Sequence, residues 1–73
     1  MLTVDLQKLK KVRKQQMSLE QMSSKLGYSS PNGYYYLESG RSHITAETLA
    51  KVATILNVPI EEFFFDDGKP FNM

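Results

Sequence analysis

The sequence predicts an all-α domain, a compact bundle of five short helices. Apolar residues recur at the i, i+3, i+4 and i+7 spacing of a helix face, most clearly over residues 45–56. Serine or threonine precedes the periodic segments and glycine follows two of them, as helix caps do. The period-two alternation and the hairpin dipeptides that indicate strands are weak throughout the chain.

The first helix is expected over residues 4–15, with Thr3 as the candidate N-cap. Asp5 lies in the expected first turn, where the helix dipole favours a carboxylate. Leu6 and Leu9 share one face of this helix, and the lysines of the segment occupy its other faces.

The second helix is expected to begin at Ser18, because the run SLEQ fits the S-x-x-Q capping box. Met22 and Leu26 lie four residues apart on its buried side. Gly27 then supplies a residue that readily adopts the left-handed conformation at a helix end.

The third helix is expected in the stretch SSPNGYYYLESG at residues 29–40. Ser30 is its N-cap, Pro31 stands at the first helical position, where a missing N–H costs nothing, and Gly40 ends it.

A fourth helix is expected from Thr45 to the break at residues 57–59, which include a proline. A fifth, of one or two turns, is expected over residues 60–64. Residues 1–65 then form one domain, and residues 66–73 form a C-terminal tail. The apolar positions of the fourth helix are Ala46, Leu49, Val52, Ala53 and Leu56.

Composition excludes several classes of protein. The 73 residues are the size of one small domain, and a 41% apolar content is typical of a compact globular chain. With no cysteine and one histidine, no disulfide framework, metal site or cofactor is expected. No apolar run or leader suits a membrane, so the expected location is the cytoplasm. An enzyme is the least favoured class, because the chain has no carboxylate pair spaced for acid–base work and no glycine-rich phosphate cradle.

The net charge of +1 is distributed unevenly. Residues 1–41 carry seven cations and three carboxylates, a net +4, whereas residues 42–73 carry two cations and five carboxylates, a net −3. A chain with this asymmetry can present a positive side to a polyanion.

Two short helices joined by a glycine-containing turn, the second opened by a capping serine, form a helix-turn-helix pattern. The run SLEQMSSKLGYSSPNGYYYLESGRSHITAETLAKVATILNVPIEEFF resembles the Cro/C1-type (XRE-like) helix-turn-helix family of phage and bacterial repressors. Its most specific parts are LESGR at 37–41, TAETL at 45–49 and ILNVPI at 55–60. The resemblance implies a lambda-repressor-like fold and a sequence-specific transcriptional repressor that binds double-stranded DNA.

Two departures from the family pattern cancel each other. The link from Arg13 to Ser18 is one residue shorter than usual, and the segment from Gly27 to Glu38 is one residue longer. Arg13 and Glu38 therefore keep the separation of the family's arginine–glutamate pair. The resemblance implies a structural ion pair that ties the first helix to the end of the third, and two independent solvated charges are the alternative.

Helical spacing divides the three consecutive tyrosines. Tyr34 lies three residues before Leu37, a core position, so these two share the buried face. Tyr35 and Tyr36 are rotated by about 100° and 200° from Tyr34 and are expected on the surface. In the resembled family this helix lies in the major groove with its N-terminal residues at the base edges. The DNA contacts carried over by position are Ser18, Ser30, Pro31, Asn32, Gly33, Tyr35, Tyr36, Arg41, Ser42 and His43.

Side-chain chemistry supports these contacts to different degrees. Asn32 can pair bidentately with the N6/N7 edge of adenine, and Tyr35 and Tyr36 offer hydroxyls to phosphates and rings to thymine methyls. Gly33 costs a helix interior about 1 kcal/mol relative to alanine, which a close approach to the groove wall would justify. The alternative is that residues 31–33 form a turn that precedes the helix.

Phosphate contacts are expected at two places. The N-terminus of the second helix at Ser18 is a candidate anion site because of its free N–H groups and the helix dipole, although Leu19 stands where the family often has glutamine. The loop at residues 40–43 can meet the sugar–phosphate chain through its amides and Arg41. For His43 a solvated loop position is favoured.

The run Phe63-Phe64-Phe65 needs partners. Phe63 matches the family's last core position, and exposed aromatic residues mark interfaces, so Phe64 and Phe65 are candidates for a homodimer interface. A dimer would place two recognition helices one DNA turn apart. Equally open is the alternative that all three phenylalanines fold back onto the first helix.

A helical protein–protein adaptor is the alternative function, because tyrosine and phenylalanine clusters and a near-neutral charge suit a protein partner. Salt distinguishes the two, since only a DNA-binding protein loses affinity for duplex DNA steeply as salt rises.

Overall fold

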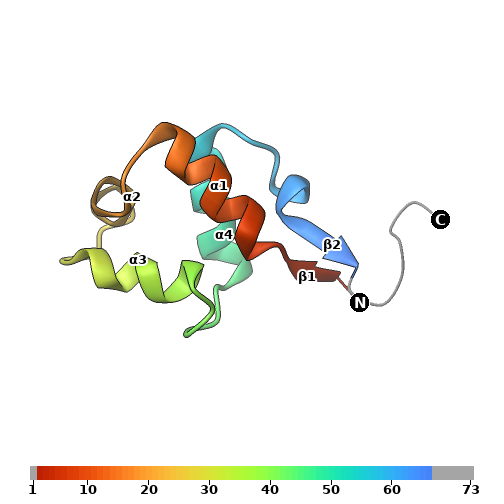
Figure 1. Ribbon diagram of the computed structural model, residues 1–73, viewed down its shortest axis with the longest axis horizontal. Helices are drawn as coiled ribbons and strands as arrows, with labels where there is room; N and C mark the ends of the chain where they lie inside the picture. The colour runs from red at the N-terminus through yellow and green to blue at the C-terminus, as the bar shows by residue number, and fades with distance from the viewer. Residues whose placement is uncertain (1, 67–73) are drawn as a thin grey trace.

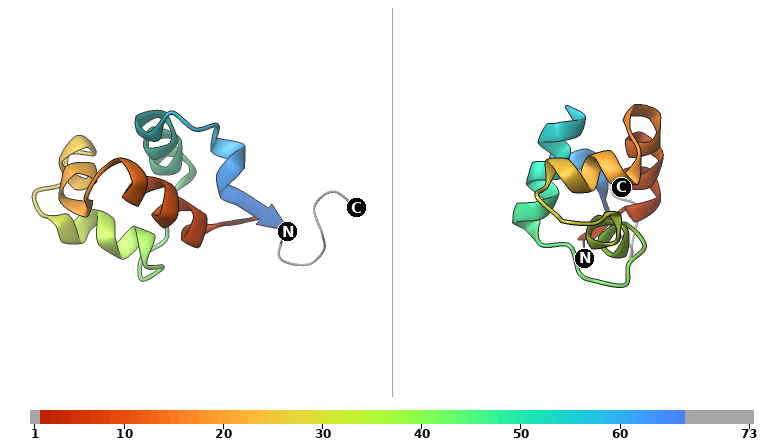
Figure 2. Two further views of the ribbon diagram at one scale, coloured as in Figure 1. Left: turned by 45° about the horizontal axis from the view of Figure 1, so that its top comes forward. Right: turned by 90° about the vertical axis from the view of Figure 1, so that its left-hand side faces the viewer.

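The computed structural model describes residues 2–66. The four α-helices form one body, and the two strands project from it at the end opposite α2 (Figures 1 and 2). The elements follow in the order β1 (Leu2–Val4), α1 (Leu6–Gln16), α2 (Leu19–Lys25), α3 (Pro31–Glu38), α4 (Ala46–Leu56), the 3-10 helix η1 (Ile60–Phe63) and β2 (Phe64–Asp66).

The prediction of an all-α fold is wrong at both ends of the described chain. β1 and β2 form an antiparallel sheet in which Val4 lies opposite Phe64 and Thr3 opposite Phe65. β-branched and aromatic residues favour such a surface, but three-residue strands are too short to show a period-two pattern. The fifth predicted helix, over residues 60–64, is the 3-10 helix η1, which is followed directly by β2, so a fifth α-helix is not confirmed.

The start of α1 differs from the prediction because the preceding residues belong to β1. Asp5, not Thr3, is the N-cap, and its Oδ1 accepts a hydrogen bond from the Lys8 N–H at 3.1 Å. The Asp5 N–H donates to the Phe63 carbonyl at 2.7 Å. This bond fastens the beginning of α1 to the end of η1.

The predicted capping box of α2 is confirmed, and Ser30 is the N-cap residue of α3 as predicted, although its side chain makes no capping hydrogen bond. Ser18 Oγ accepts from the Gln21 N–H at 3.1 Å, and Gln21 Oε1 accepts from the Ser18 N–H at 2.9 Å. Gly27, just after α2, has a φ of +89°, in the left-handed region that glycine adopts without strain. α3 begins at Pro31, so the alternative that residues 31–33 are a turn is wrong.

α4 covers the other side of the core. Thr45 caps it, as predicted, and Asn57, with a φ of 60°, ends it in the left-handed conformation. Ala46 is exposed, although the sequence pattern places it with the apolar positions. The predicted tail of residues 66–73 lies outside the described residues except for Asp66. The buried apolar core consists of Leu9, Met22, Tyr34, Leu37, Leu49, Val52, Ala53, Leu56 and Phe63.

Candidate nucleic-acid interface

A buried serine joins α2 to the beginning of α3. The Ser23 hydroxyl donates to the Pro31 carbonyl at 3.1 Å, and the Ser23 carbonyl accepts from the Tyr28 N–H at 2.9 Å. The two bonds fix the turn and the first residue of α3 against α2, which leaves the far side of α3 facing outward (Figure 2). The pattern of two helices and a turn is therefore a fixed unit in space.

The two sides of α3 differ in burial as the helical spacing predicts. Tyr34 is fully buried, at 0% exposed, and Leu37 and Glu38 are buried with it. Tyr35 and Tyr36 are each 39% exposed, and Asn32 is exposed as well. With 100° per residue, Asn32, Tyr35 and Tyr36 fall within about 100° of arc on the outer side. The structure thus brings three predicted contact residues onto one surface.

A buried ion pair holds the inner side of α3 to α1. Arg13 donates from Nη2 to Glu38 Oε1 at 2.8 Å and from Nε to Glu38 Oε2 at 3.1 Å. A third bond, from Arg13 Nη1 to the Met17 carbonyl at 3.1 Å, uses the remaining guanidinium nitrogen. The hydrogen bonds with Glu38 raise the pKa of Arg13 further above its usual value. The predicted ion pair between Arg13 and Glu38 is therefore confirmed, and the alternative of two solvated charges is wrong.

The phenol of Tyr34 lies beside this pair. Desolvation, followed by the neighbouring Glu38 carboxylate, raises the pKa of Tyr34 far above its usual value of 10.0. Its hydroxyl is buried and makes no well-formed hydrogen bond with the described residues. Tyr34 is therefore a neutral core residue and is not available to a ligand.

Tyr28 packs so closely on Gly33 that no larger residue fits at this position, and the sequence does not predict this contact. A Cβ at Gly33 would lie 2.8 Å from both Cγ and Cδ1 of Tyr28 and 3.1 Å from its Cβ. The base of the Tyr28 ring therefore packs on the backbone of the first turn of α3. Close approach to a groove wall is not needed to explain this glycine. The cost of a glycine in a helix was a usable signal, but nothing in the sequence identifies an aromatic partner across a turn.

The loop after α3 carries a positioned cation. The guanidinium carbon of Arg41 lies 5.7 Å from the centre of the Tyr36 ring, within the range of a cation–π contact. The Ser42 N–H donates to the Tyr36 carbonyl at 3.1 Å, which folds the loop against the end of α3. Arg41, Ser42 and His43 are all exposed. The structure therefore places this predicted contact loop next to the outer tyrosines.

The two capping serines differ. At Ser18 the capping box uses the hydroxyl as an acceptor and the N–H as a donor, and Glu20 adds a negative charge to the same turn. Both features oppose the binding of an anion at this helix end, where the sequence analysis expects a phosphate contact. Ser30 is exposed, and its side chain makes no capping bond to α3. Its hydroxyl is free of that role.

One of the predicted surface cations is paired with the acidic half of the chain. Lys8 Nζ lies 2.6 Å from Glu62 Oε1, and both side chains are about half exposed. The hydrogen bond from Lys8 lowers the pKa of Glu62 below its usual 4.5. Lys8 is thus bound to η1, and the Glu62 carboxylate compensates its charge.

The three phenylalanines have three environments. Phe63 is fully buried, as predicted. Phe64 is half-buried, faces Val4 across the sheet and packs against the core. Phe65 is 43% exposed. The chain folds back so that β2 pairs with β1, and Phe65 remains on the surface.

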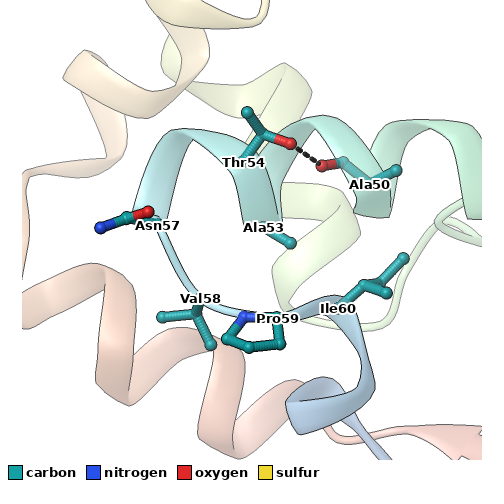
Figure 3. Close-up of a pocket in the computed structure, with 7 residues that line it drawn as sticks. All are labelled: Ala50, Ala53, Thr54, Asn57, Val58, Pro59 and Ile60. Atoms are coloured by element: carbon teal, nitrogen blue, oxygen red, sulfur yellow. Dashed lines mark hydrogen bonds between the residues drawn. The ribbon is translucent and has the colours of Figure 1, made fainter.

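A shallow pocket lies away from the helix-turn-helix. It is formed by the C-terminal half of α4 and the segment that leads into η1 (Figure 3). No charged residue lines it, and Thr54 donates to the Ala50 carbonyl at its rim.

Within residues 2–66, no cluster of three or more His, Cys, Asp or Glu side chains is arranged to hold a metal ion. No helix in this part of the chain is long and apolar enough to cross a membrane.

Comparison with known proteins identifies the family. The helix-turn-helix family model matches residues 9–63, which run from α1 to η1 and include α2, the turn and α3. No curated protein and no solved structure matches the chain significantly. The matched family consists of DNA-binding transcription regulators and is generally not enzymatic. With three quarters of its residues in the match, the chain belongs to the helix-turn-helix family of the XRE/Cro/C1 type.

Proposed function

We propose that this regulator is a sequence-specific repressor that reads the major groove of double-stranded DNA with α3. The observation that carries the proposal is the division of α3 into two sides. Asn32, Tyr35 and Tyr36 face outward, whereas Tyr34 and Glu38 are fixed in the interior. The major groove, about 12 Å wide, admits one α-helix, and an exposed carboxamide and two phenols can meet base edges there.

Arg41 supplies the contact to the DNA backbone in this proposal. Its guanidinium lies over the Tyr36 ring, at the edge of the outer side of α3. The exposed residues Ser42 and His43 continue this edge. Contacts of this kind to phosphates set the register of a protein on the duplex, and base contacts set its specificity.

We further propose a homodimer in which the projecting sheet, with Phe64 and Phe65, forms the interface. A two-stranded sheet is marginally stable by itself. This one carries Leu2 and Phe65 at 54% and 43% exposed, two of the largest apolar exposures in the described chain. A second copy would cover these side chains and give the operator two half-sites. The change Phe65→Ser should shift a concentration series in sedimentation from dimer to monomer, whereas an unchanged dimer would refute this interface.

Repression follows from occupancy in this proposal. A dimer bound across a promoter would exclude polymerase without any enzymatic step, and its effect would depend on protein concentration. A reporter gene preceded by the selected site should lose expression as the protein accumulates. Increased expression would instead identify an activator.

The experiment that tests the proposal is selection of duplexes from a random library, followed by a salt titration on the selected site. Binding to that site should weaken steeply with salt, because several phosphates are neutralised. An adaptor protein would retain no duplex at any salt concentration, and that outcome would refute the DNA-binding proposal.

Two variants separate base contacts from backbone contacts. Asn32→Ala should relax the preference at one base pair by about 1–3 kcal/mol with a modest loss of overall affinity. Arg41→Ala should weaken specific and non-specific binding alike and reduce the salt slope by about one phosphate. Gln15→Ala and Lys51→Ala remove an exposed amide and an exposed cation outside α3 and serve as matched controls. An unchanged sequence preference in Asn32→Ala would show that α3 is not the reading element as assigned.

A further inference from the structure

The outer side of α3 carries no formal charge. The one charged residue of α3, Glu38, is buried with Arg13. At 100° per residue, Ser39 at the C-cap falls on the same outer side as Asn32, Tyr35 and Tyr36. This surface therefore offers a carboxamide and two phenols, together with the Ser39 hydroxyl, which donates to the Tyr36 carbonyl at 3.3 Å.

Guanine lacks its usual partner on this surface. Guanine is most often read by an arginine or lysine that donates two hydrogen bonds to O6 and N7. Arg41 is the only lysine or arginine between Lys25 and Lys51. It follows the C-terminal end of α3, with its guanidinium over the Tyr36 ring, whereas base contacts in a helix-turn-helix come from the N-terminal residues of the helix. Arg41 is thus placed for the phosphate backbone.

Adenine and thymine, in contrast, both have partners. The Asn32 carboxamide can donate to N7 and accept from N6 of adenine. The rings of Tyr35 and Tyr36, with centroids 6.0 Å apart and planes tilted by 51°, form two adjoining apolar walls, and Arg41 covers one face of the Tyr36 ring. Apolar walls of this kind pack against the C5-methyl group of thymine, the one apolar group in the major groove.

We propose that α3 reads A·T base pairs and that the pyrimidine methyl group, packed on Tyr35 and Tyr36, is the principal determinant of the site. This inference rests on the proposed function and adds the chemical class of the base pairs. Recognition of a methyl group, unlike recognition by hydrogen bonds, does not distinguish thymine from a cytosine that carries the same methyl group. A methyl group on C5 projects from the same place whether the base is thymine or 5-methylcytosine, so methylated cytosine partly replaces thymine.

The test changes only the DNA. In the duplex selected by the wild-type protein, each thymine is replaced in turn by uracil, which removes one methyl and keeps the base pair. Affinity should fall about fourfold at one or two positions, the value expected for one buried methyl group. A duplex with cytosine at one of those positions should bind no more tightly than the duplex with uracil there. Replacement of that cytosine by 5-methylcytosine should recover part of the lost affinity.

Variants of Tyr35 and Tyr36 test whether these rings contact the thymine methyl group. In Tyr35→Ala or Tyr36→Ala, the uracil penalty should disappear at the position that faces the missing ring. Tyr35→Phe and Tyr36→Phe keep the rings and should keep the penalty. Both tyrosines lie on the surface, so circular dichroism and thermal unfolding should confirm that the variants remain folded.

The outcomes distinguish the two proposals. Selected sites that place guanine opposite α3, or uracil substitutions that are neutral at every position, overturn the methyl-reading inference and leave DNA binding intact. A uracil penalty that persists in both alanine variants assigns the methyl contact to other residues and also overturns it. Failure to select any duplex refutes the proposed function itself.

Discussion

Replacement of Gly33 by alanine tests how the start of α3 is held. In an isolated helix this change stabilises by up to about 1 kcal/mol, because alanine loses less backbone entropy than glycine. In this structure the new Cβ would lie 2.8 Å from two ring atoms of Tyr28. Real Cβ atoms do not approach so closely, so either Tyr28 or α3 must move.

The ring cannot move away cheaply. The conflict involves Cγ and Cδ1 and, at 3.1 Å, the Cβ of Tyr28, so rotation of the far end of the side chain does not relieve it. The Tyr28 backbone is fixed by its 2.9 Å bond to the Ser23 carbonyl. Insertion of a methyl group into such a contact costs about 1–3 kcal/mol. Set against the gain in helix propensity, Gly33→Ala should lose about 1 kcal/mol, or about 4–8 °C in melting temperature for a domain of this size.

A double-mutant cycle isolates this contact. In the Tyr28→Ala background the obstacle is absent, so the same Gly33→Ala change should raise stability by about 0.5–1 kcal/mol. Urea denaturation of the wild type, the two single variants and the double variant gives both values under identical conditions. Equal effects of Gly33→Ala in the two backgrounds would refute the packing of Tyr28 on this glycine.

Three further changes test the interior and one surface pair. Arg13→Met leaves the Glu38 carboxylate buried and unpaired and should cost about 3–5 kcal/mol in urea denaturation, whereas adding Glu38→Leu should recover part of that loss. Tyr34→Phe removes a buried hydroxyl without a well-formed hydrogen bond, so stability should stay constant or rise by up to about 1 kcal/mol. A clear loss in that variant would show that the hydroxyl is bonded to Glu38. Since Lys8 lowers the pKa of Glu62 below 4.5, this pair stabilises the fold above that pH and is lost as the pH falls through the lowered pKa. Glu62→Gln should therefore make acid destabilisation below about pH 5 shallower, and an unchanged profile would count against the pair.

The sequence predicts well those features that depend on local chemistry. The Ser18 capping box, the proline at the start of α3 and the left-handed Gly27 each follow from a few neighbouring residues. The division of the tyrosines follows from one angle, 100° per residue, and one core position. Local signals also predicted the four α-helices, with their bounds shifted by a residue or two.

The features that the sequence did not predict are contacts between residues that no sequence pattern connects. The pairing of β1 with β2 joins residues 60 or more positions apart, and neither three-residue segment carries a pattern of its own. The same pairing changed the cap of α1 from Thr3 to Asp5, because it drew the preceding residues into a strand. The packing of Tyr28 on Gly33 is also a spatial fit across a turn. A glycine in a helix indicates that something is close, but it does not indicate what.

The buried Arg13–Glu38 pair explains how α3 can present an uncharged outer side. Helical spacing places Glu38 on the same side of α3 as Tyr34, so a carboxylate at this position has to be accommodated in the interior. An unpaired carboxylate there would be costly, and Arg13 compensates it with two hydrogen bonds to the two carboxylate oxygens. A buried pair of this kind contributes little net stability, so its effect lies in geometry. Because it fixes the rotation of α3 about its own axis relative to α1, it determines which side chains face outward, so the candidate reading surface depends on a contact in the interior.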